Sequence, residues 1–316
     1  MAQPSRRFTR YAWSVVFFLL LVILWGAWVR ISGAGAGCGN HWPTCNGQVL
    51  PIAPNTKTLI EFTHRLTSGL CLPMVLLMLG WAWRIFPKGH GVRRASLITL
   101  VFLISEAALG AGLVKFELVA DNASVARAIT AALHLINTFT LAGAATLAAW
   151  WSQQPEPHPW KTASQLKWAL VMGLGLLVFS SMSGAVTALG DTLFPTSIFV
   201  EGGLVARLKE DLSGSTHFLV QLRLIHPILA VGTAFYLLFL SFGIRAEHET
   251  GQRVSLGWSL TLLTGLQLFA GFSNIVLGAP GWLQILHLLL ALCIVLNVLL
   301  LLAVVLAEAP AQGLST

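Results

Sequence analysis

Eight apolar runs, each about long enough to cross a bilayer, constrain the fold of this chain more than any other feature. They occupy roughly residues 11–31, 58–83, 95–114, 127–151, 166–188, 217–243, 254–277 and 282–307. A helix needs about 20 consecutive apolar residues to cross the hydrocarbon core of a membrane. The runs lack the alternation of polar and apolar residues that is typical of a transmembrane β-strand. Only 10% of the residues are charged, too few to cover a water-facing surface. The sequence therefore predicts an all-α integral membrane protein with eight transmembrane helices.

The basic residues indicate how these helices are oriented. If the N-terminus is cytoplasmic, the segments on that side carry eleven Lys and Arg residues, and the segments on the opposite side carry six. Cytoplasmic loops of membrane proteins are enriched in Lys and Arg. We therefore expect both termini in the cytoplasm and the segments 32–57, 115–126, 189–216 and 278–281 outside it. The same distribution accounts for the net charge of +7 without a nucleic-acid partner.

The two halves of the chain resemble each other. GAWVRISGAGAG at the end of the first run is similar to SGAVTALGD at the end of the fifth, and EFTHRLTSG in the second run lies where RLIHPILAVG lies in the sixth. AALHLINTF in the fourth run matches QILHLLLAL in the eighth. Each half has an even number of helices, so both enter the membrane in the same direction and form parallel repeats. We expect an N-terminal four-helix half at 1–151, a cytoplasmic linker at 152–165 and a C-terminal four-helix half at 166–316.

Four histidines lie inside the apolar runs, one near the outer end of each even-numbered run. They are His64, His134, His226 and His287. Ionisable side chains within a membrane are costly and usually functional. Zinc would need further ligands for each pair, and a proton relay would need a longer chain of titratable groups. Haem needs only one or two axial nitrogens and an apolar slot between helices. The sequence therefore predicts one bis-histidine haem in each half, both toward the outer leaflet.

The residue three positions before the first histidine differs between the halves. It is Glu61 in the first half and Arg223 in the second, and residues three apart share one face of a helix. An arginine beside a haem can pair with a propionate, whereas a carboxylate beside an anionic porphyrin has no such role. The difference indicates that the first half carries out chemistry through Glu61 and the second half holds a permanent cofactor. The alternative is that Glu61 faces the water interface or pairs with Arg65.

The first outer segment contains two cysteines among glycines, a tryptophan and a proline. GAGAGCGNHWPTCNGQVLP, residues 33–51, places Cys38 and Cys45 seven positions apart. Disulfides persist outside the cytoplasm. Three interpretations stay open: a structural disulfide, a redox-active pair, and a metal site that includes His41. In contrast, Cys71 and Cys293 lie inside helices and are expected to be small packing residues.

The stretch RISGAGAGCGNHWPTCNGQVLP followed by EFTHRLTSG resembles the first outer loop and second helix of the heme A synthases, in particular the bacterial type with a cysteine pair in this loop. The resemblance covers essentially the whole chain and all four histidines. It implies an oxidoreductase of the bacterial cytoplasmic membrane that oxidises the C8 methyl group of heme O to a formyl group, giving heme A for terminal oxidases. It also implies that His64 and His134 hold the iron of the substrate haem, that His226 and His287 ligate a heme b, and that Glu61 is needed for activity.

The partners expected from this resemblance are a heme O synthase that supplies the substrate, an electron acceptor such as a quinone or a thiol-redox protein, the lipid bilayer, and further copies of the chain in a homo-oligomer. Glu61 could act as a base, or could stabilise a cationic methylene before water adds.

Two other function classes stay open. A dihaem cytochrome b, carrying electrons between quinol and a periplasmic partner, explains the four histidines equally well but gives Glu61 and the cysteine loop no role. A transporter with histidines in a proton path would need more polar residues than Glu106, Gln267 and Asn274 in its third and seventh helices.

Overall fold

A computed structural model describes residues 6–153, 165–195, 209, 217–246 and 250–307. Within these residues, eight helices are long and apolar enough to cross a membrane, which confirms the predicted all-α membrane fold. They are α1 (Arg6–Ile31), α2 (Thr56–Ile85), α3 (Gly91–Lys115), α4 (Val125–Trp151), α5 (Gln165–Leu193), α8 (Ile225–Ala246), α9 (Gln252–Leu277) and α10 (Gly281–Ala307). The short helix α7 (Phe218–Gln221) and the 3-10 turn η1 (Leu222–Leu224) lead directly into α8, so the sixth crossing begins at Phe218.

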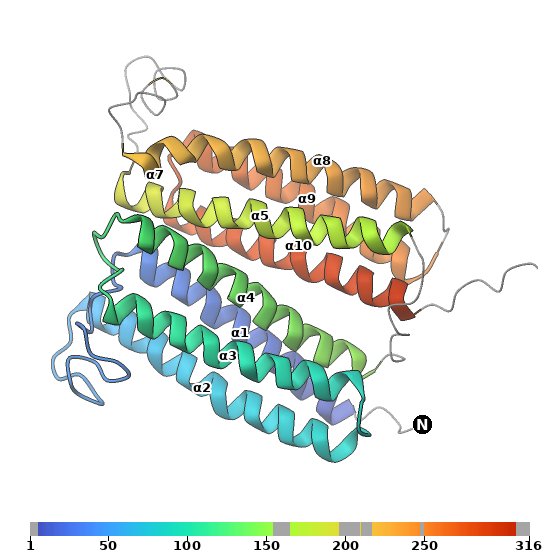
Figure 1. Ribbon diagram of the computed structural model, residues 1–316, viewed down its shortest axis with the longest axis horizontal. Helices are drawn as coiled ribbons and strands as arrows, with labels where there is room; N and C mark the ends of the chain where they lie inside the picture. The colour runs from blue at the N-terminus through green and yellow to red at the C-terminus, as the bar shows by residue number, and fades with distance from the viewer. Residues whose placement is uncertain (1–5, 154–164, 196–208, 210–216, 247–249, 308–316) are drawn as a thin grey trace, which may run out of the picture.

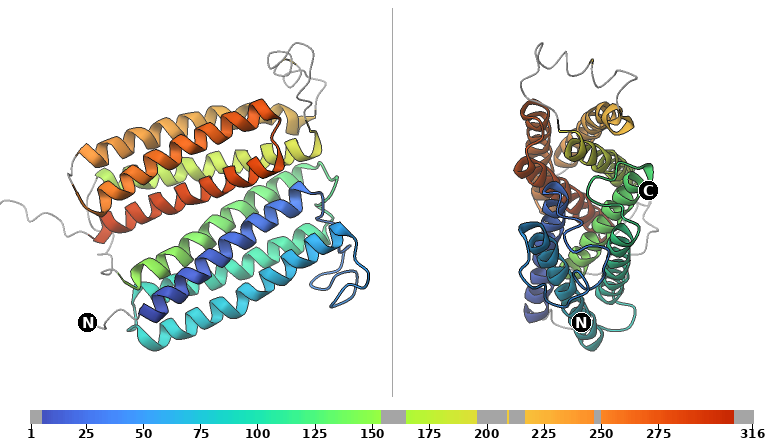
Figure 2. Two further views of the ribbon diagram at one scale, coloured as in Figure 1. Left: turned by 180° about the vertical axis from the view of Figure 1, so that it is seen from behind. Right: turned by 90° about the vertical axis from the view of Figure 1, so that its left-hand side faces the viewer.

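The helices lie side by side along a common direction (Figure 1). Helices α1 to α4 form one group and α5, α8, α9 and α10 form a second group, an arrangement that is also seen from behind in Figure 2. Residues 32–55 project from one end of the bundle, which we call the disulfide end. The predicted linker at 152–165 and the predicted outer segment at 189–216 lie largely outside the described residues.

Each group of helices has an apolar core of its own. Phe8, Val75 and Met78 are fully buried where α1, α2 and α3 meet, and the ring of Phe8 packs edge-on against Trp81 and Phe86. The core of the second group is formed by leucines, isoleucines and valines of α5, α8, α9 and α10, and it also includes Phe139 of α4. Leu141, Ala145, Ala148 and Ala149 of α4 belong to the first core. Because α4 contributes to both cores, it joins the two groups.

Small residues allow the two groups to approach closely. Gly143 of α4 lies against Leu299 of α10, where a Cβ on the glycine would be 3.0 Å from the leucine Cδ2. Gly281, at the start of α10, lies so close to α1 that a Cβ would be 2.6 Å from Ile31 Cγ2. Without a hydrophobic driving force between helices in lipid, close packing of this kind is a main source of helix association.

Arg30 adds a polar link between the groups at the disulfide end. Its Nη1 donates hydrogen bonds to the carbonyl oxygen of Ala188 (2.7 Å) and to Thr192 Oγ1 (2.6 Å), both on α5. Its Nη2 donates to Gln284 Oε1 on α10 at 3.1 Å. One side chain of α1 therefore ties together two helices of the second group.

The outward faces of α8 and α9 are rich in exposed phenylalanines. Phe235, Phe239, Phe242, Phe269 and Phe272 have exposed fractions of 65–79%. A water-soluble protein rarely exposes so many large apolar side chains together. These faces are suited to contact with lipid, in agreement with the membrane-spanning assignment.

Candidate functional site

The segment between α1 and α2 is closed by a disulfide. Cys38 and Cys45 are joined, and both side chains are buried. The backbone N–H of Asn46 donates to the carbonyl oxygen of Cys38 at 3.0 Å, and Cys45 and Gln48 exchange two hydrogen bonds of 2.9 Å each. The disulfide that is observed bears on the three interpretations that the sequence leaves open. It is compatible with both a structural clip and a redox-active pair.

The loop lies directly on the first turns of α2. Thr58 Oγ1 donates a hydrogen bond to the carbonyl oxygen of Gly37 at 2.8 Å, and the side chain of Asn55 caps the helix by accepting from Thr58 N. A Cβ at Gly37 would be only 2.5 Å from the carbonyl oxygen of Lys57. Only glycine therefore permits this close approach of the loop backbone to α2.

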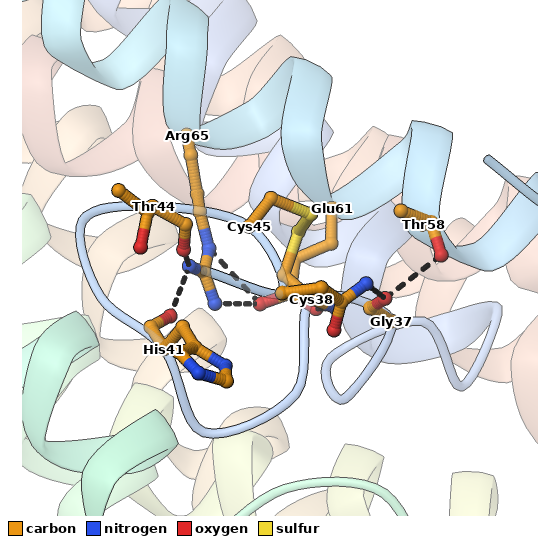
Figure 3. A network of polar contacts seen from close by, with 9 residues as sticks. Gly37, Cys38, His41, Thr44, Cys45, Thr58, Glu61 and Arg65 are labelled. Atoms are coloured by element: carbon orange, nitrogen blue, oxygen red, sulfur yellow. Dashed lines mark hydrogen bonds and ion pairs between the residues drawn. A yellow bond between two sulfur atoms is a disulfide. The ribbon is translucent and has the colours of Figure 1, made fainter. Parts of the chain in front are cut away.

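Glu61 is buried beneath the loop, with an exposed fraction of 3%. Its Oε2 accepts a hydrogen bond from the backbone N–H of Cys38 at 2.8 Å, and its Oε1 accepts from Arg65 Nη2 at 2.5 Å and Nε at 3.1 Å (Figure 3). Arg65 Nη1 in turn donates to the carbonyl oxygens of His41 (2.5 Å) and Thr44 (2.6 Å). The predicted alternative for Glu61, pairing with Arg65, is thus observed. The pair also binds both sides of the disulfide loop.

In the first group of helices, the predicted pair is His64 on α2 and His134 on α4. Gly26 of α1 packs against the first ring, since a Cβ there would be 2.9 Å from His64 Cε1. The Nδ1 atom of His134 lies 3.4 Å from Glu106 Oε2 of α3. Within the described part of the chain, the buried Nδ1 atoms of both histidines have no hydrogen-bond partner.

In the second group, His226 on α8 and His287 on α10 have ring centroids 6.3 Å apart with their planes nearly perpendicular. Gly184 of α5 packs on the first ring as Gly26 does in the other half, and a Cβ there would be 2.9 Å from His226 Cε1. Nδ1 of His226 is 3.1 Å from both the carbonyl oxygen of Ser180 and Ser183 Oγ. These contacts leave Nε2 as the nitrogen available to a ligand.

Arg223 lies at the disulfide end, close to the second histidine pair. Its Nε is 2.9 Å from Asp191 Oδ1, and its Nη2 donates to the carbonyl oxygens of Gly190 (2.8 Å) and Phe194. The arginine therefore holds the end of α5 against η1. Its predicted pairing with a haem propionate stays a prediction.

The spacing of the second histidine pair fits an iron porphyrin. A metal–imidazole bond is about 2 Å long, so two imidazoles on opposite faces of one iron have ring centroids about 6 Å apart, and His226 and His287 show 6.3 Å. Gly26 and Gly184 keep side chains away from the rings. Among the described residues, no three His, Cys, Asp or Glu side chains are grouped as metal ligands. A porphyrin iron needs only one or two such ligands, and each histidine pair can supply two.

Sequence reasoning missed the roles of Gly26, Gly184 and Glu106. The repeat contains a signal for each of them. The two glycines occupy matching positions in GAWV and GAVT, and Glu106 and Gln267 each precede a glycine by four residues. Aligning the third and seventh helices on those glycines pairs Glu106 with Gln267.

Comparison with known proteins agrees with this architecture. The chain matches the COX15-CtaA family, described as cytochrome oxidase assembly protein, over residues 9–299. It is 46% identical over 295 residues to a protoheme IX farnesyltransferase of Thermus thermophilus, an alignment that covers 93% of this chain and 48% of that protein. It is also 43% identical over 98 residues to the heme A synthase of Shouchella clausii, which covers 31% of this chain and 33% of that protein.

The heme A synthase of Geobacillus kaustophilus is 38% identical over 104 residues, 33% of either chain. The chain spans about half the length of the Thermus relative. The family match extends through all eight membrane-spanning helices and includes all four intramembrane histidines and the disulfide loop. This protein therefore belongs to the COX15-CtaA family of cytochrome oxidase assembly proteins.

Proposed function

We propose that this protein is a heme A synthase, a membrane oxidoreductase that converts the C8 methyl group of heme O to a formyl group. The observation that carries the proposal is the unequal surroundings of two similar histidine pairs. Among the described residues, only the first pair has a buried carboxylate one helical turn away, Glu61, that is held beneath a disulfide loop. The family match over residues 9–299 supports the proposal. So do the relatives named heme A synthase, each matched over about a third of its length.

The two pairs take different haems in this proposal. His64 and His134 hold the iron of heme O, the substrate, and His226 and His287 hold a resident heme b. Support for this division comes from the second pair, where a buried arginine, Arg223, lies three residues before His226, and an arginine is suited to pair with an anionic propionate. At the corresponding position of the first pair stands Glu61, which suits chemistry better than the binding of an anion.

The protein's own residues position the substrate and handle protons. When bound, the haem iron supplies the redox chemistry of the oxidation. His64 and His134 orient the porphyrin, and Gly26 leaves room for the His64 ring. With water as the oxygen source, converting a methyl to a formyl group releases four electrons and four protons. Glu61, one helical turn from His64, is a carboxylate placed to accept protons. Arg65 and the N–H of Cys38 fix the position of that carboxylate.

The disulfide end is the extracytoplasmic end in this proposal, and the membrane is the bacterial cytoplasmic membrane. The basic residues Arg84, Arg93, Arg245 and Arg253 lie at the opposite end of the helices, as the positive-inside rule requires of the cytoplasmic side. Both termini are then cytoplasmic, and the disulfide is in a compartment where it persists. A quinone or a thiol-redox protein at this end accepts the electrons.

A heme O synthase is the proposed supplier of substrate. The Thermus relative is named for farnesyl transfer to protoheme IX, and this chain covers 48% of its length. The segment that the two proteins share matches the cytochrome oxidase assembly family. We therefore place the farnesyl transfer in the part of the Thermus relative that this chain does not cover.

A dihaem cytochrome b is the second candidate, favoured by the 6.3 Å separation of His226 and His287 and by the matching glycines of the two halves. Expression together with a heme O synthase, followed by haem extraction and chromatography, separates the two functions. Heme A in the extract supports the synthase, and its absence from protein that binds two haems supports the cytochrome. A His134→Ala variant is the control, since it removes a ligand of the substrate site only.

A further inference from the structure

We infer that Glu106 is a positioning residue for His134, and that the Glu106–Gln267 difference between the halves gives the two haem sites different reduction potentials. The inference rests on the proposed haem sites. It concerns the polar side chain of the preceding helix, α3 or α9, that lies beside the second histidine of each pair.

In the first half, the carboxylate of Glu106 is held beside His134 by two neighbours of that histidine. Oε2 of Glu106 lies 3.4 Å from His134 Nδ1 and accepts a hydrogen bond from Asn137 Nδ2 at 2.5 Å, while Oε1 accepts from Thr138 Oγ1. Asn137 and Thr138 follow His134 by three and four residues, so they share its face of α4. Three side chains on one face of α4 thus contact the carboxylate of Glu106 on α3.

The position of Asn137 is itself fixed from α3. Ser105 Oγ donates to Asn137 Oδ1 at 2.5 Å, and Asn137 Nδ2 also donates to the carbonyl oxygen of Phe102 at 2.9 Å. Asn137 and Thr138 are buried. A network with this many hydrogen bonds in a low-dielectric interior leaves Glu106 little freedom to turn away from His134.

In the second half, the corresponding residue is the neutral Gln267. Its Nε2 lies 3.2 Å from His287 Nε2, whereas Glu106 faces Nδ1, the other ring nitrogen, of His134. The residues three and four after His287 are Leu290 and Ala291, which offer no hydrogen bond to a side chain of α9. The second site therefore has an amide in place of the carboxylate, and it lacks the polar neighbours that fix Glu106.

A carboxylate beside the ring nitrogen that does not bind the metal orients a metal-bound imidazole and makes it a more basic ligand. Hydrogen bonding and charge around the ligands are among the factors by which a protein sets the potential of a haem. A more basic ligand and a nearby negative charge both favour ferric over ferrous iron. We therefore expect the haem of the first half to have the lower reduction potential.

The test uses full-length protein in which only one pair is complete. The His287→Ala variant is loaded with haemin at the first pair and titrated potentiometrically, with and without Glu106→Gln. The expected result is unchanged haem stoichiometry and an unchanged low-spin spectrum, with the midpoint potential shifted upward by Glu106→Gln. The reciprocal change, Gln267→Glu in a His134→Ala background, is expected to shift the potential of the second pair downward. Glu117→Gln removes a carboxylate from the α3–α4 connection and should leave both potentials unchanged.

An unchanged potential in haem-loaded Glu106→Gln protein overturns the inference and leaves the haem sites standing. If His287→Ala protein binds no low-spin haem even with Glu106 present, the proposed site itself is wrong, and the inference is overturned with it. If the Glu106→Gln substitution abolishes haem binding at the first pair, the Glu106→Asp variant tests whether a carboxylate is needed there. Recovery of haem with a low potential supports a positioning carboxylate, and no recovery overturns it.

Discussion

The backbone N–H of Cys38 donates a 2.8 Å hydrogen bond to Oε2 of Glu61, which lies 23 residues later in the chain. Cys38 is one half of the loop disulfide, and Glu61 lies one helical turn before His64 on α2. The covalent closure of the loop and the buried carboxylate are therefore in direct contact. A change in the loop reaches Glu61 directly through this hydrogen bond, and also through Arg65, which binds the loop carbonyls of His41 and Thr44.

Replacing Glu61 with glutamine tests the carboxylate itself. A glutamine oxygen can still accept from Cys38 N–H, but the side chain no longer carries a charge opposite Arg65. We expect haem binding to be kept and heme A output to fall by about 100-fold or more, the usual contribution of a general acid or base. Unoxidised or partly oxidised haem should accumulate and be detected by chromatography of extracted haem. Glu117→Gln is the matched control, and normal heme A output from Glu61→Gln would remove Glu61 from the reaction.

The disulfide is expected to stabilise the folded protein measurably. Cys38 and Cys45 are seven residues apart, and closing a loop of this length contributes about 2–3 kcal/mol in the chain-entropy model. Replacing both cysteines with serine should lower the free energy of unfolding by that amount and loosen the contact with Glu61. Thermal unfolding in detergent, with and without a thiol reductant, measures the effect. Reductant should lower the unfolding temperature of the protein with both cysteines and should not change that of the double variant. Equal stability of the two proteins would show that the disulfide is not a structural clip.

The sequence was sufficient to predict the helices because length and hydropathy decide which segments cross a membrane. All eight predicted runs overlap a described helix, and the two ends of α4 differ from the prediction by no more than two residues. The four histidines could be singled out because imidazoles are rare inside membrane spans and recur at matching positions of the repeat.

Side-chain partners were harder to predict, because they depend on how neighbouring helices are rotated and aligned. A helix in lipid is apolar on most sides, so its sequence gives little indication of the face toward α3 or α5. The contact of Glu106 with His134 and the pairing of Arg223 with Asp191 both depend on that alignment. The Glu61–Arg65 pair could be foreseen, since it lies within one helix at a spacing of four residues.

Two glycine-to-alanine substitutions test whether the histidine rings require the space beside them. A Cβ at Gly26 or Gly184 would lie 2.9 Å from Cε1 of His64 or His226, and one of the two groups must then move. We expect Gly26→Ala to reduce haem at the first pair and Gly184→Ala to reduce it at the second, each leaving the other pair occupied. Haem stoichiometry from pyridine haemochrome spectra measures this. Gly80→Ala and Gly175→Ala, where nothing lies within 4 Å, are the controls. Full haem content in both test variants would mean that the rings have room to shift.

Arg30 offers a test of how firmly the two helix groups are joined. It makes three hydrogen bonds to Ala188, Thr192 and Gln284 across the boundary, and hydrogen bonds between membrane helices contribute about 0.6 kcal/mol each on average. Arg30→Met keeps much of the apolar bulk of the side chain and removes all three bonds, so we expect a loss of roughly 2 kcal/mol in the free energy of unfolding. Unfolding in mixed micelles with increasing denaturing detergent measures it, and the exposed Arg7→Met on the same helix is the control. Because the bonds lie at the disulfide end, Arg30→Met should also weaken haem retention. Unchanged stability would show that close packing around Gly143 and Gly281 joins the groups without help from Arg30.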